Sequence, residues 1–276
     1  MAFKYPPGFS AQTALGFLNF CQQAYNMYYI YKGEKQSNGQ PYVFTVPQGY
    51  EMTYEIWGDG TILGLDEGEV PYGFVAQKQG ANDLVITVRG TEGDIEWADD
   101  LLEAEQAANP VPNSQGLVHE GFGNIYKSLI YAPGDYYSMF PPPPDTAQTL
   151  SQVVSGASSV AVTGHSLGSS LADLVALDVA LNEKPPVPSL YTLASPRTGD
   201  PNFADSFDAK LQPVSYRIAN CWDIVPTLPP EDFYTGIDEE WHYQHVNSAC
   251  PVDGGFTLDI VYSHSLAAYR VGLEKI

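Results

Sequence analysis

A strand-like segment runs directly into a helix-like segment around one serine in the stretch VAVTGHSLGSSLADLVAL. Residues 159–163 are mostly small and β-branched, which favours a strand, and leucines and valines of segment 167–181 recur at helical spacing. So sharp a turn brings two backbone segments close together, and it needs small residues such as Gly164 and Gly168 on both sides. The pattern predicts a strand–turn–helix unit that exposes Ser166 above a sheet, where the helix dipole favours developing negative charge.

The five-residue pattern GHSLG is weak evidence when taken alone. A chain with 25 glycines among 276 residues matches it by chance about 0.15 times, so the serine could simply occupy a glycine-rich turn. A serine is a poor nucleophile without a base, and the base needs an orienting acid. After a turn of this kind the acid and the histidine follow in the order Ser, Asp or Glu, His.

Two later loops supply that order. Asp223 lies in NCWDIVPTLPP, just after a predicted strand at 214–219, and His264 lies in YSHSLAAY, after a predicted strand at 256–261. Each would stand at the carboxyl end of its strand, where the loops of an α/β sheet carry function. We therefore predict Ser166 as nucleophile, His264 as base and Asp223 as its orienting acid. The alternative for Asp223 is a turn cap before Pro226.

Four other histidines compete for the role of base. His165 adjoins the serine, but neighbouring side chains on a sharp turn point apart. His242 and His245 lie in EEWHYQHV, in or beside a strand, and His245 is the alternative base. His119 lies in the segment HEGF.

The reaction also needs donors for an oxyanion. One donor is normally the N–H after the nucleophile, here that of Leu167, and another comes from the loop after an earlier strand. The segment LVITVRGT is such a strand and turn, so the N–H and hydroxyl of Thr91 could both face the oxyanion. From the residues alone, the Thr91 hydroxyl could equally bond the backbone of its own turn.

The remaining periodicity predicts the architecture. Expected helices cover 10–30, 124–131, 146–154, 167–181, 202–211 and 265–273, and expected strands cover 50–57, 72–78, 83–88, 159–163, 189–194, 214–219, 243–246 and 256–261. Alternating strands and helices predict an α/β fold with a mostly parallel central sheet, helices on both faces and antiparallel strands at the N-terminal edge. The proline run 141–144 is too short to separate domains, so residues 1–276 are expected to form a single domain.

Charge and cysteine content exclude several classes. With 12 Lys and Arg against 33 Asp and Glu, the net charge of −21 disfavours nucleic acid as a partner. No apolar run reaches the ~18 residues of a membrane span, and the first residues show no secretory signal. Three cysteines build neither a disulfide scaffold nor a tetrahedral zinc site, so no metal site is expected, and pairing of Cys221 with Cys250 is open.

The chain resembles the class 3 lipase family over roughly residues 80 to 270. The matching pieces occur in family order: VITVRGT, VHEGFGNIY, VAVTGHSLGSSLADL, YTLASPRTGD, YRIANCWDIVPTLPP, WHYQHV and SHSLAAY. The resemblance implies an α/β-hydrolase fold, a triad of Ser166, Asp223 and His264, an oxyanion donor at Thr91, and no cofactor. It also implies structural rather than catalytic roles for His119 and His245.

By the same resemblance a lid follows the RGT turn, at residues 92–102 (EGDIEWADDLL), with Trp97 and Asp100 at family lid positions. Its helical spacing places Ile95 and Leu102 on one face, with Trp97 beside them, which would also suit an ordinary surface helix. The five acidic residues of the segment are unusual for an apolar lid. They suit neutral or zwitterionic lipid interfaces better than anionic ones.

These observations predict a serine carboxylic-ester hydrolase, a lipase that cleaves acylglycerol esters at a lipid–water interface. A feruloyl esterase or a phospholipase A1 on the same scaffold is the alternative. A non-catalytic α/β-hydrolase used for binding is the rival from another class. The resemblance implies an extracellular location, although without a visible signal a cytoplasmic one stays open. The sequence makes no prediction of oligomeric state.

Overall fold

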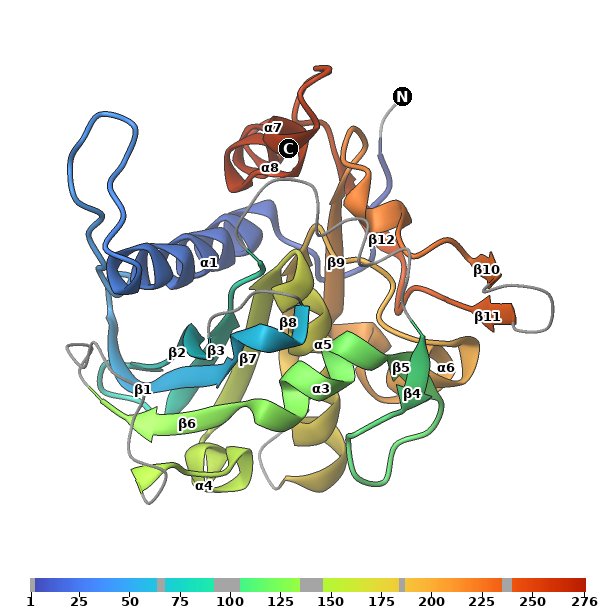
Figure 1. The fold of residues 1–276 in the computed structure, drawn as a ribbon, viewed down its shortest axis with the longest axis horizontal. Helices are drawn as coiled ribbons and strands as arrows, with labels where there is room; N and C mark the ends of the chain where they lie inside the picture. The colour runs from blue at the N-terminus through green and yellow to red at the C-terminus, as the bar shows by residue number, and fades with distance from the viewer. Residues whose placement is uncertain (1–2, 64–67, 92–104, 135–145, 184–186, 235–239) are drawn as a thin grey trace.

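The structure, a computed structural model, describes residues 3–63, 68–91, 105–134, 146–183, 187–234 and 240–276 (Figure 1). The helices are α1 (Ala11–Tyr31), α3 (Glu120–Ser128), α4 (Leu150–Val154), α5 (Leu167–Asn182), α6 (Pro201–Leu211), α7 (Ile260–His264) and α8 (Leu266–Leu273). The strands are β1 (Tyr50–Asp59), β2 (Glu69–Lys78), β3 (Asp83–Val88), β4 (Gln106–Ala108), β5 (Leu117–His119), β6 (Ile130–Pro133), β7 (Ser159–His165), β8 (Ser189–Leu193), β9 (Ser215–Asn220), β10 (Asp232–Tyr234), β11 (Glu240–His242) and β12 (Ala249–Val252). Short 3-10 turns cover Gly60–Leu63, Gln212–Val214 and Val225–Thr227.

The described strands form one large sheet in the order β12-β9-β8-β7-β3-β2-β1-β6. The strands from β12 to β3 are parallel, whereas β2, β1 and β6 add antiparallel at one edge. The predicted mostly parallel sheet with antiparallel N-terminal strands is therefore confirmed. Its parallel strands are buried on both faces, which explains their near-continuous apolar sequences.

Helices cover both faces of this sheet, as Figure 1 shows. Helix α1 packs on β2, β3 and β7 and against α8, while α5 packs on β7 and β8 and against α3 and α6. Helix α5 is buried around most of its surface, which agrees with its high apolar content. The carboxyl ends of β3, β7 and β9 lie at the same edge of the sheet because these strands are parallel. The loops that follow them are therefore brought together.

Two predicted strands near the C-terminus were wrong. Residues 256–261 form a loop and the start of α7, since Leu258 and Val261 are exposed and Asp259 caps the helix by accepting a hydrogen bond from the Tyr262 N–H. The strand predicted at 243–246 is replaced by β11 just before it and β12 just after it. In segment 256–261 the apolar side chains face solvent, whereas a strand assignment from apolar content assumes burial; in segment 243–246 Tyr243 and Val246 are buried without forming a strand.

Two predicted helices have different bounds in the structure. The helix predicted at 124–131 is α3, which begins earlier, at Glu120, and ends at Ser128. Residues 130–133 form the edge strand β6, which pairs with β1. Helix α4 begins only after Thr149, whose side chain and that of Gln152 form a capping box. In both cases a cap or a strand partner, rather than periodicity, decides the boundary.

The three cysteines are free, with Cys21 and Cys250 buried and Cys221 exposed. Among the residues that the structure describes, no helix has the length and apolar character needed to cross a bilayer.

A buried carboxyl group on α5 makes stability depend on pH. Asp173 is fully buried; its Oδ2 accepts a hydrogen bond of 2.6 Å from the Thr198 hydroxyl, and its Oδ1 has no partner among the described residues. Burial raises its pKa from 3.8 to about 7. Between these two values the folded chain holds a proton that the unfolded chain has released, so folding becomes less favourable as the pH rises.

We expect Asp173→Asn to stabilise the protein progressively between pH 4 and pH 8, because the amide accepts the Thr198 hydrogen bond without ionising. At about 1.4 kcal/mol per pKa unit, the gain relative to wild type is on the order of 4 kcal/mol at pH 8. Urea unfolding of both proteins at the two pH values measures this gain. An identical difference in free energy of unfolding at pH 4 and pH 8 would contradict it.

Candidate active site

Ser166 lies at the turn between β7 and α5, with φ of 61° and ψ of −133°. A non-glycine residue at positive φ is strained, and the surrounding structure holds it there. The Ser166 N–H donates to the carbonyl of Leu193 at 2.9 Å, and the Ser169 hydroxyl donates to the carbonyls of Gly164 and Leu193. These bonds tie the turn to the neighbouring strand β8.

The two flanking glycines are required by close backbone approach. A Cβ atom on Gly164 would lie 2.1 Å from the carbonyl oxygen of Gly168, and one on Gly168 would lie 2.3 Å from that of Val88. These separations are far below van der Waals contact, and the clashing atoms belong to the backbone. The turn therefore excludes any side chain at either position.

The structure brings the three residues of the predicted triad together. The Ser166 Oγ lies 2.8 Å from His264 Nε2, and His264 Nδ1 lies 2.9 Å from Asp223 Oδ2. A carboxylate can only accept, so Nδ1 carries the hydrogen and Nε2 accepts from the serine hydroxyl. The Asp223 side chain is fully buried, and the His264 side chain is 16% exposed. The arrangement can draw a proton from Ser166 and stabilise the imidazolium that forms.

Asp223 is held by two further donors. The Tyr269 hydroxyl donates to Oδ2 at 2.8 Å, and the Val225 N–H donates to Oδ1 at 3.0 Å. Burial, together with the Asp223 charge, raises the pKa of Tyr269 well above its ordinary value, so this hydroxyl remains a donor. No sequence pattern singled out Tyr269 as a site residue, although it lies five positions after His264 in the segment SHSLAAY.

The candidate oxyanion donors lie next to the nucleophile. A Cβ atom on Gly90 would lie 2.7 Å from the Ser166 Cβ, so the turn after β3 packs directly against the serine. The hydroxyl of Thr91, the next residue, is buried and has no hydrogen-bond partner among the described residues. Leu167 is the first residue of α5, and the first N–H groups of a helix have no carbonyl acceptor within that helix, so the Leu167 N–H can bind an oxyanion.

The other histidines take no part in the Ser166–His264 pair. Burial lowers the pKa of His245 to about 3, and its Nε2 bonds the carbonyl of Pro226 at 2.6 Å. Burial likewise lowers the pKa of His119 to about 3, and its ring stacks on Phe122. His242 is exposed and pairs with Asp232. His165 points away from Ser166, as expected from the turn, and bonds elsewhere.

The predicted lid falls outside the described residues. Segment 92–102, with Ile95, Trp97 and Asp100, lies within the undescribed range 92–104.

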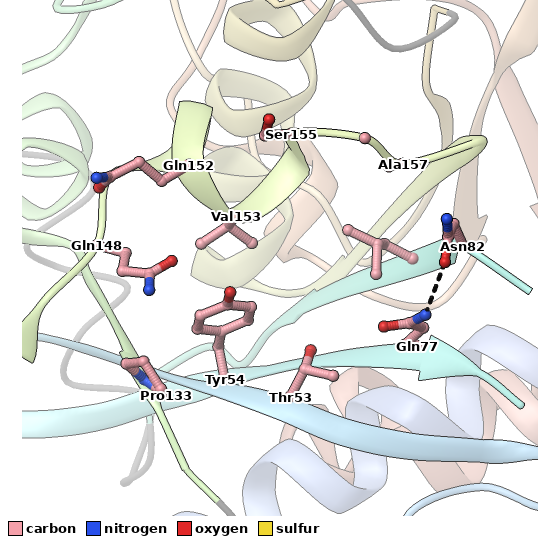
Figure 2. Close-up of a pocket in the computed structure, with 12 residues that line it drawn as sticks. Thr53, Tyr54, Gln77, Asn82, Pro133, Gln148, Gln152, Val153, Ser155 and Ala157 are labelled. Carbon is pink, nitrogen blue, oxygen red and sulfur yellow. Dashed lines mark hydrogen bonds between the residues drawn. The ribbon is translucent and has the colours of Figure 1, made fainter.

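A cavity of about 450 Å³ opens between β1 and α4 (Figure 2). Its lining is uncharged, with Tyr54, Gln148 and the hydrogen-bonded pair Gln77 and Asn82 (3.2 Å) around it. Asn82 precedes β3, so this cavity lies at the amino ends of the parallel strands, opposite the end that carries Ser166. It contributes nothing to the candidate active site.

One group of described side chains could hold a metal ion. Asp232, Glu240 and His242 lie on the hairpin of β10 and β11, and all three are exposed. This group lies apart from the hydrogen bonds that join Ser166, His264 and Asp223.

Comparison with known proteins gives related sequences. A family model described as Lipase (class 3) matches residues 85–233. Phospholipase A1-II 3 of Oryza sativa subsp. japonica is 34% identical over 186 residues, covering 60% of this chain and 43% of the relative. A lipase of Rhizomucor miehei is 33% identical over 166 residues, covering 58% of this chain and 41% of the relative. The chain spans less than half the length of these curated relatives.

Solved structures of similar fold were also found. The triacylglyceride lipase of Rhizomucor miehei superposes with a TM-score of 0.61 at 22% identity, covering 96% of this chain and 98% of that one. The Lip2 lipase of Yarrowia lipolytica superposes with a TM-score of 0.59 at 22% identity, covering 89% and 80%. At this identity the likeness concerns the fold, and it confirms the expected α/β-hydrolase architecture.

Proposed function

Because this chain belongs to the class 3 lipase family, we propose that it hydrolyses carboxylic esters, acylglycerols above all, through an acyl-enzyme. The observation that carries the proposal is the continuous chain from Ser166 Oγ through His264 to the buried Asp223 carboxylate. Three contacts support it: Ser166 Oγ lies within hydrogen-bond distance of an imidazole nitrogen, the other ring nitrogen faces a carboxylate, and that carboxylate can stabilise the charge that develops on the imidazole. Residues 1–276 act in this proposal as one hydrolase domain.

Each step uses residues of this chain. The Ser166 oxygen attacks the ester carbonyl carbon while His264 Nε2 takes its proton. The Thr91 and Leu167 donors stabilise the negative oxygen of the tetrahedral intermediate. The intermediate collapses, the alcohol leaves with the proton from His264, and the acyl group stays on Ser166. Water then attacks the acyl-enzyme as His264 accepts its proton. When this second tetrahedral intermediate collapses, His264 returns the proton to the Ser166 oxygen, which releases the acid and restores the serine.

An exposed apolar surface supports a lipid substrate. We call it the apolar rim; its members, all at least 42% exposed, are Trp222, Ile224, Phe256, Leu258, Ile260 and Val261. The first two flank Asp223 in sequence, and the others precede or belong to α7, which ends at His264. The rings of Trp222 and Phe256 pack edge to face with their centroids 4.8 Å apart, so the two segments are in contact. A monomer rarely leaves such residues clustered in water unless they contact an apolar partner.

We expect Leu258→Glu to weaken adsorption to emulsified tributyrin about 10-fold, because an exposed leucine contributes roughly 1.5 kcal/mol or more when it enters an apolar phase. The rate on soluble p-nitrophenyl butyrate should stay within about twofold of wild type. Val187→Glu adds the same charge at a half-exposed valine outside the rim. It should leave both the adsorption to tributyrin and the rate on p-nitrophenyl butyrate unchanged. Equal losses on both substrates in Leu258→Glu would contradict an interfacial role.

The function itself is tested by labelling and by a substrate series. A fluorophosphonate should label Ser166 covalently, as located by peptide mass spectrometry, which a non-catalytic binding scaffold would not do. The series compares emulsified triacylglycerols of several chain lengths, phosphatidylcholine vesicles and methyl ferulate. Fastest release of fatty acid from acylglycerols is expected, and preference for methyl ferulate would overturn the lipase assignment.

A phospholipase A1 is the second candidate, favoured by the 34% identity with the rice protein of that name. The net charge of −21 then favours zwitterionic phosphatidylcholine over anionic phospholipids, which the surface would repel. Faster cleavage of phosphatidylcholine than of triacylglycerol would select this candidate. The family resemblance makes an extracellular location part of the same proposal.

A further inference from the structure

The hydroxyl of Tyr25 lies between two parts of the candidate active site. It accepts a hydrogen bond from the Gly90 N–H at 3.1 Å, and it lies 2.8 Å from His165 Nδ1. Both side chains are buried. Tyr25 comes from α1, Gly90 follows β3 and His165 ends β7, so three segments that are far apart in the sequence meet at one oxygen atom.

The direction of these bonds follows from the far side of the imidazole. His165 Nε2 lies 2.8 Å from the backbone carbonyl of His264, which can only accept, so Nε2 carries the hydrogen. Burial, with a smaller contribution from His264, lowers the pKa of His165 well below 6.5, so its ring is neutral. Nδ1 therefore has a free lone pair, and the Tyr25 O–H donates to it. Burial raises the pKa of Tyr25, which keeps that hydrogen in place.

The result is a single chain of donors and acceptors. It runs from the Gly90 N–H to the Tyr25 hydroxyl, through the ring of His165, and ends on the backbone of His264. Each bond polarises the next, which strengthens such chains in a buried setting. One end is Gly90, which precedes Thr91, and the other end is the backbone of His264, the candidate base. Within the chain, His165 directly precedes Ser166.

The groups of this hydrogen-bonded chain are closely packed around the nucleophile. A Cβ atom on Gly90 would lie 2.7 Å from the Tyr25 hydroxyl, from the Ser166 Cβ and from the His165 carbonyl oxygen alike. A shift of the Gly90 turn would therefore move the Thr91 donors relative to the serine. Misplacing catalytic groups by about 1 Å can lower a rate by about 10²-fold.

We propose that Tyr25 and His165 are positioning residues, which hold the Thr91 oxyanion donors and the His264 backbone at fixed distances from Ser166. This inference rests on the proposed ester hydrolysis. It assigns neither residue a proton-transfer role, because the hydrogens of the chain stay on the same atoms throughout the reaction. A purely structural role would instead make both residues matter for stability alone.

The first test is Tyr25→Phe, which removes one oxygen and keeps the buried ring. With p-nitrophenyl butyrate, kcat and kcat/KM should both fall about 10-fold while KM stays within about twofold, because only transition-state stabilisation is lost. The inhibition constant of phenylboronic acid, whose adduct with serine mimics the tetrahedral intermediate, should rise by a similar factor. Tyr131→Phe is the matched control: it is equally buried but lies in β6, and its kinetics should equal wild type.

The second test concerns the coupling of the two residues. His165→Asn keeps an acceptor near the position of Nδ1 and loses the Nε2 hydrogen, so it interrupts the chain at its other bond. If the chain acts as one unit, the double variant should lose no more activity than the worse single variant. Multiplied losses in the double variant would contradict a single chain. The His165→Asn kinetics alone test the proposal if Tyr25→Phe does not fold.

The outcomes separate this inference from the proposed function. A wild-type chain that neither cleaves esters nor accepts the fluorophosphonate on Ser166 would overturn the function. An active wild type, together with a Tyr25→Phe variant whose kcat and boronic-acid affinity are unchanged, would overturn the positioning role and leave the function standing. The same conclusion follows if Tyr25→Phe lowers only the melting temperature.

Discussion

Ser166→Ala should lower kcat for p-nitrophenyl butyrate by about 10⁶-fold, the scale of loss found when a serine nucleophile is removed from such a triad. The physical reason is that the Ser166 hydroxyl oxygen lies 2.8 Å from His264 Nε2, and alanine has no oxygen to take its place. The alanine keeps the backbone turn, whose geometry is held by the Leu193 and Ser169 hydrogen bonds. Steady-state kinetics on purified variant, with circular dichroism to verify folding, makes the measurement.

A matched control lies one turn further along α5. Ser170 is fully buried, and its hydroxyl has no hydrogen-bond partner among the described residues. Ser170→Ala should therefore retain wild-type kcat and still accept the fluorophosphonate. Hydrolysis by Ser166→Ala at even one hundredth of the wild-type rate would remove this serine from the role of nucleophile.

Asp223→Asn should lower kcat by about 10⁴-fold with little change in KM. An asparagine amide can donate a hydrogen to His264 Nδ1, which favours the tautomer whose Nε2 carries a hydrogen and cannot take the serine proton. The carboxylate charge that stabilises the imidazolium is lost as well. The side chain is fully buried, so water cannot replace it as an acceptor.

The kcat of Tyr269→Phe should be compared with that of Asp223→Asn, because the tyrosine substitution weakens the surroundings of the carboxylate without removing it. It removes one of the hydrogen bonds to Asp223 and leaves the carboxylate and the Val225 bond in place. Its kcat should fall by about 10- to 100-fold, the scale of one hydrogen bond to a charged group at about 1.5–3 kcal/mol. If Asp223→Asn were no more damaging than Tyr269→Phe, Asp223 would hold the loop rather than orient the base.

The local parts of the site were predictable from sequence because they depend on neighbouring residues. The Gly164 and Gly168 requirement follows from one sharp turn, and the structure gives it a direct cause in the 2.1 Å and 2.3 Å backbone approaches. The parallel core of the sheet also followed from short-range alternation of strand and helix patterns. The strand predicted at 256–261 failed because an apolar stretch resembles a buried strand even when, as here, it faces solvent.

The sequence by itself therefore determined the fold class, the strand–turn–helix unit around Ser166 and the order of the three triad candidates. Only the tertiary structure decided that His264 Nε2 meets Ser166 Oγ, that the Tyr269 hydroxyl bonds Asp223, and that Tyr25 joins the turn at Gly90 to His165. The reason is separation along the chain: Ser166 and His264 are 98 positions apart in the sequence, and Tyr25 and Gly90 are 65 positions apart. Periodicity and turn chemistry act over a few residues. A hydrogen bond between distant side chains depends on strand register and helix packing, which form only when the whole domain folds.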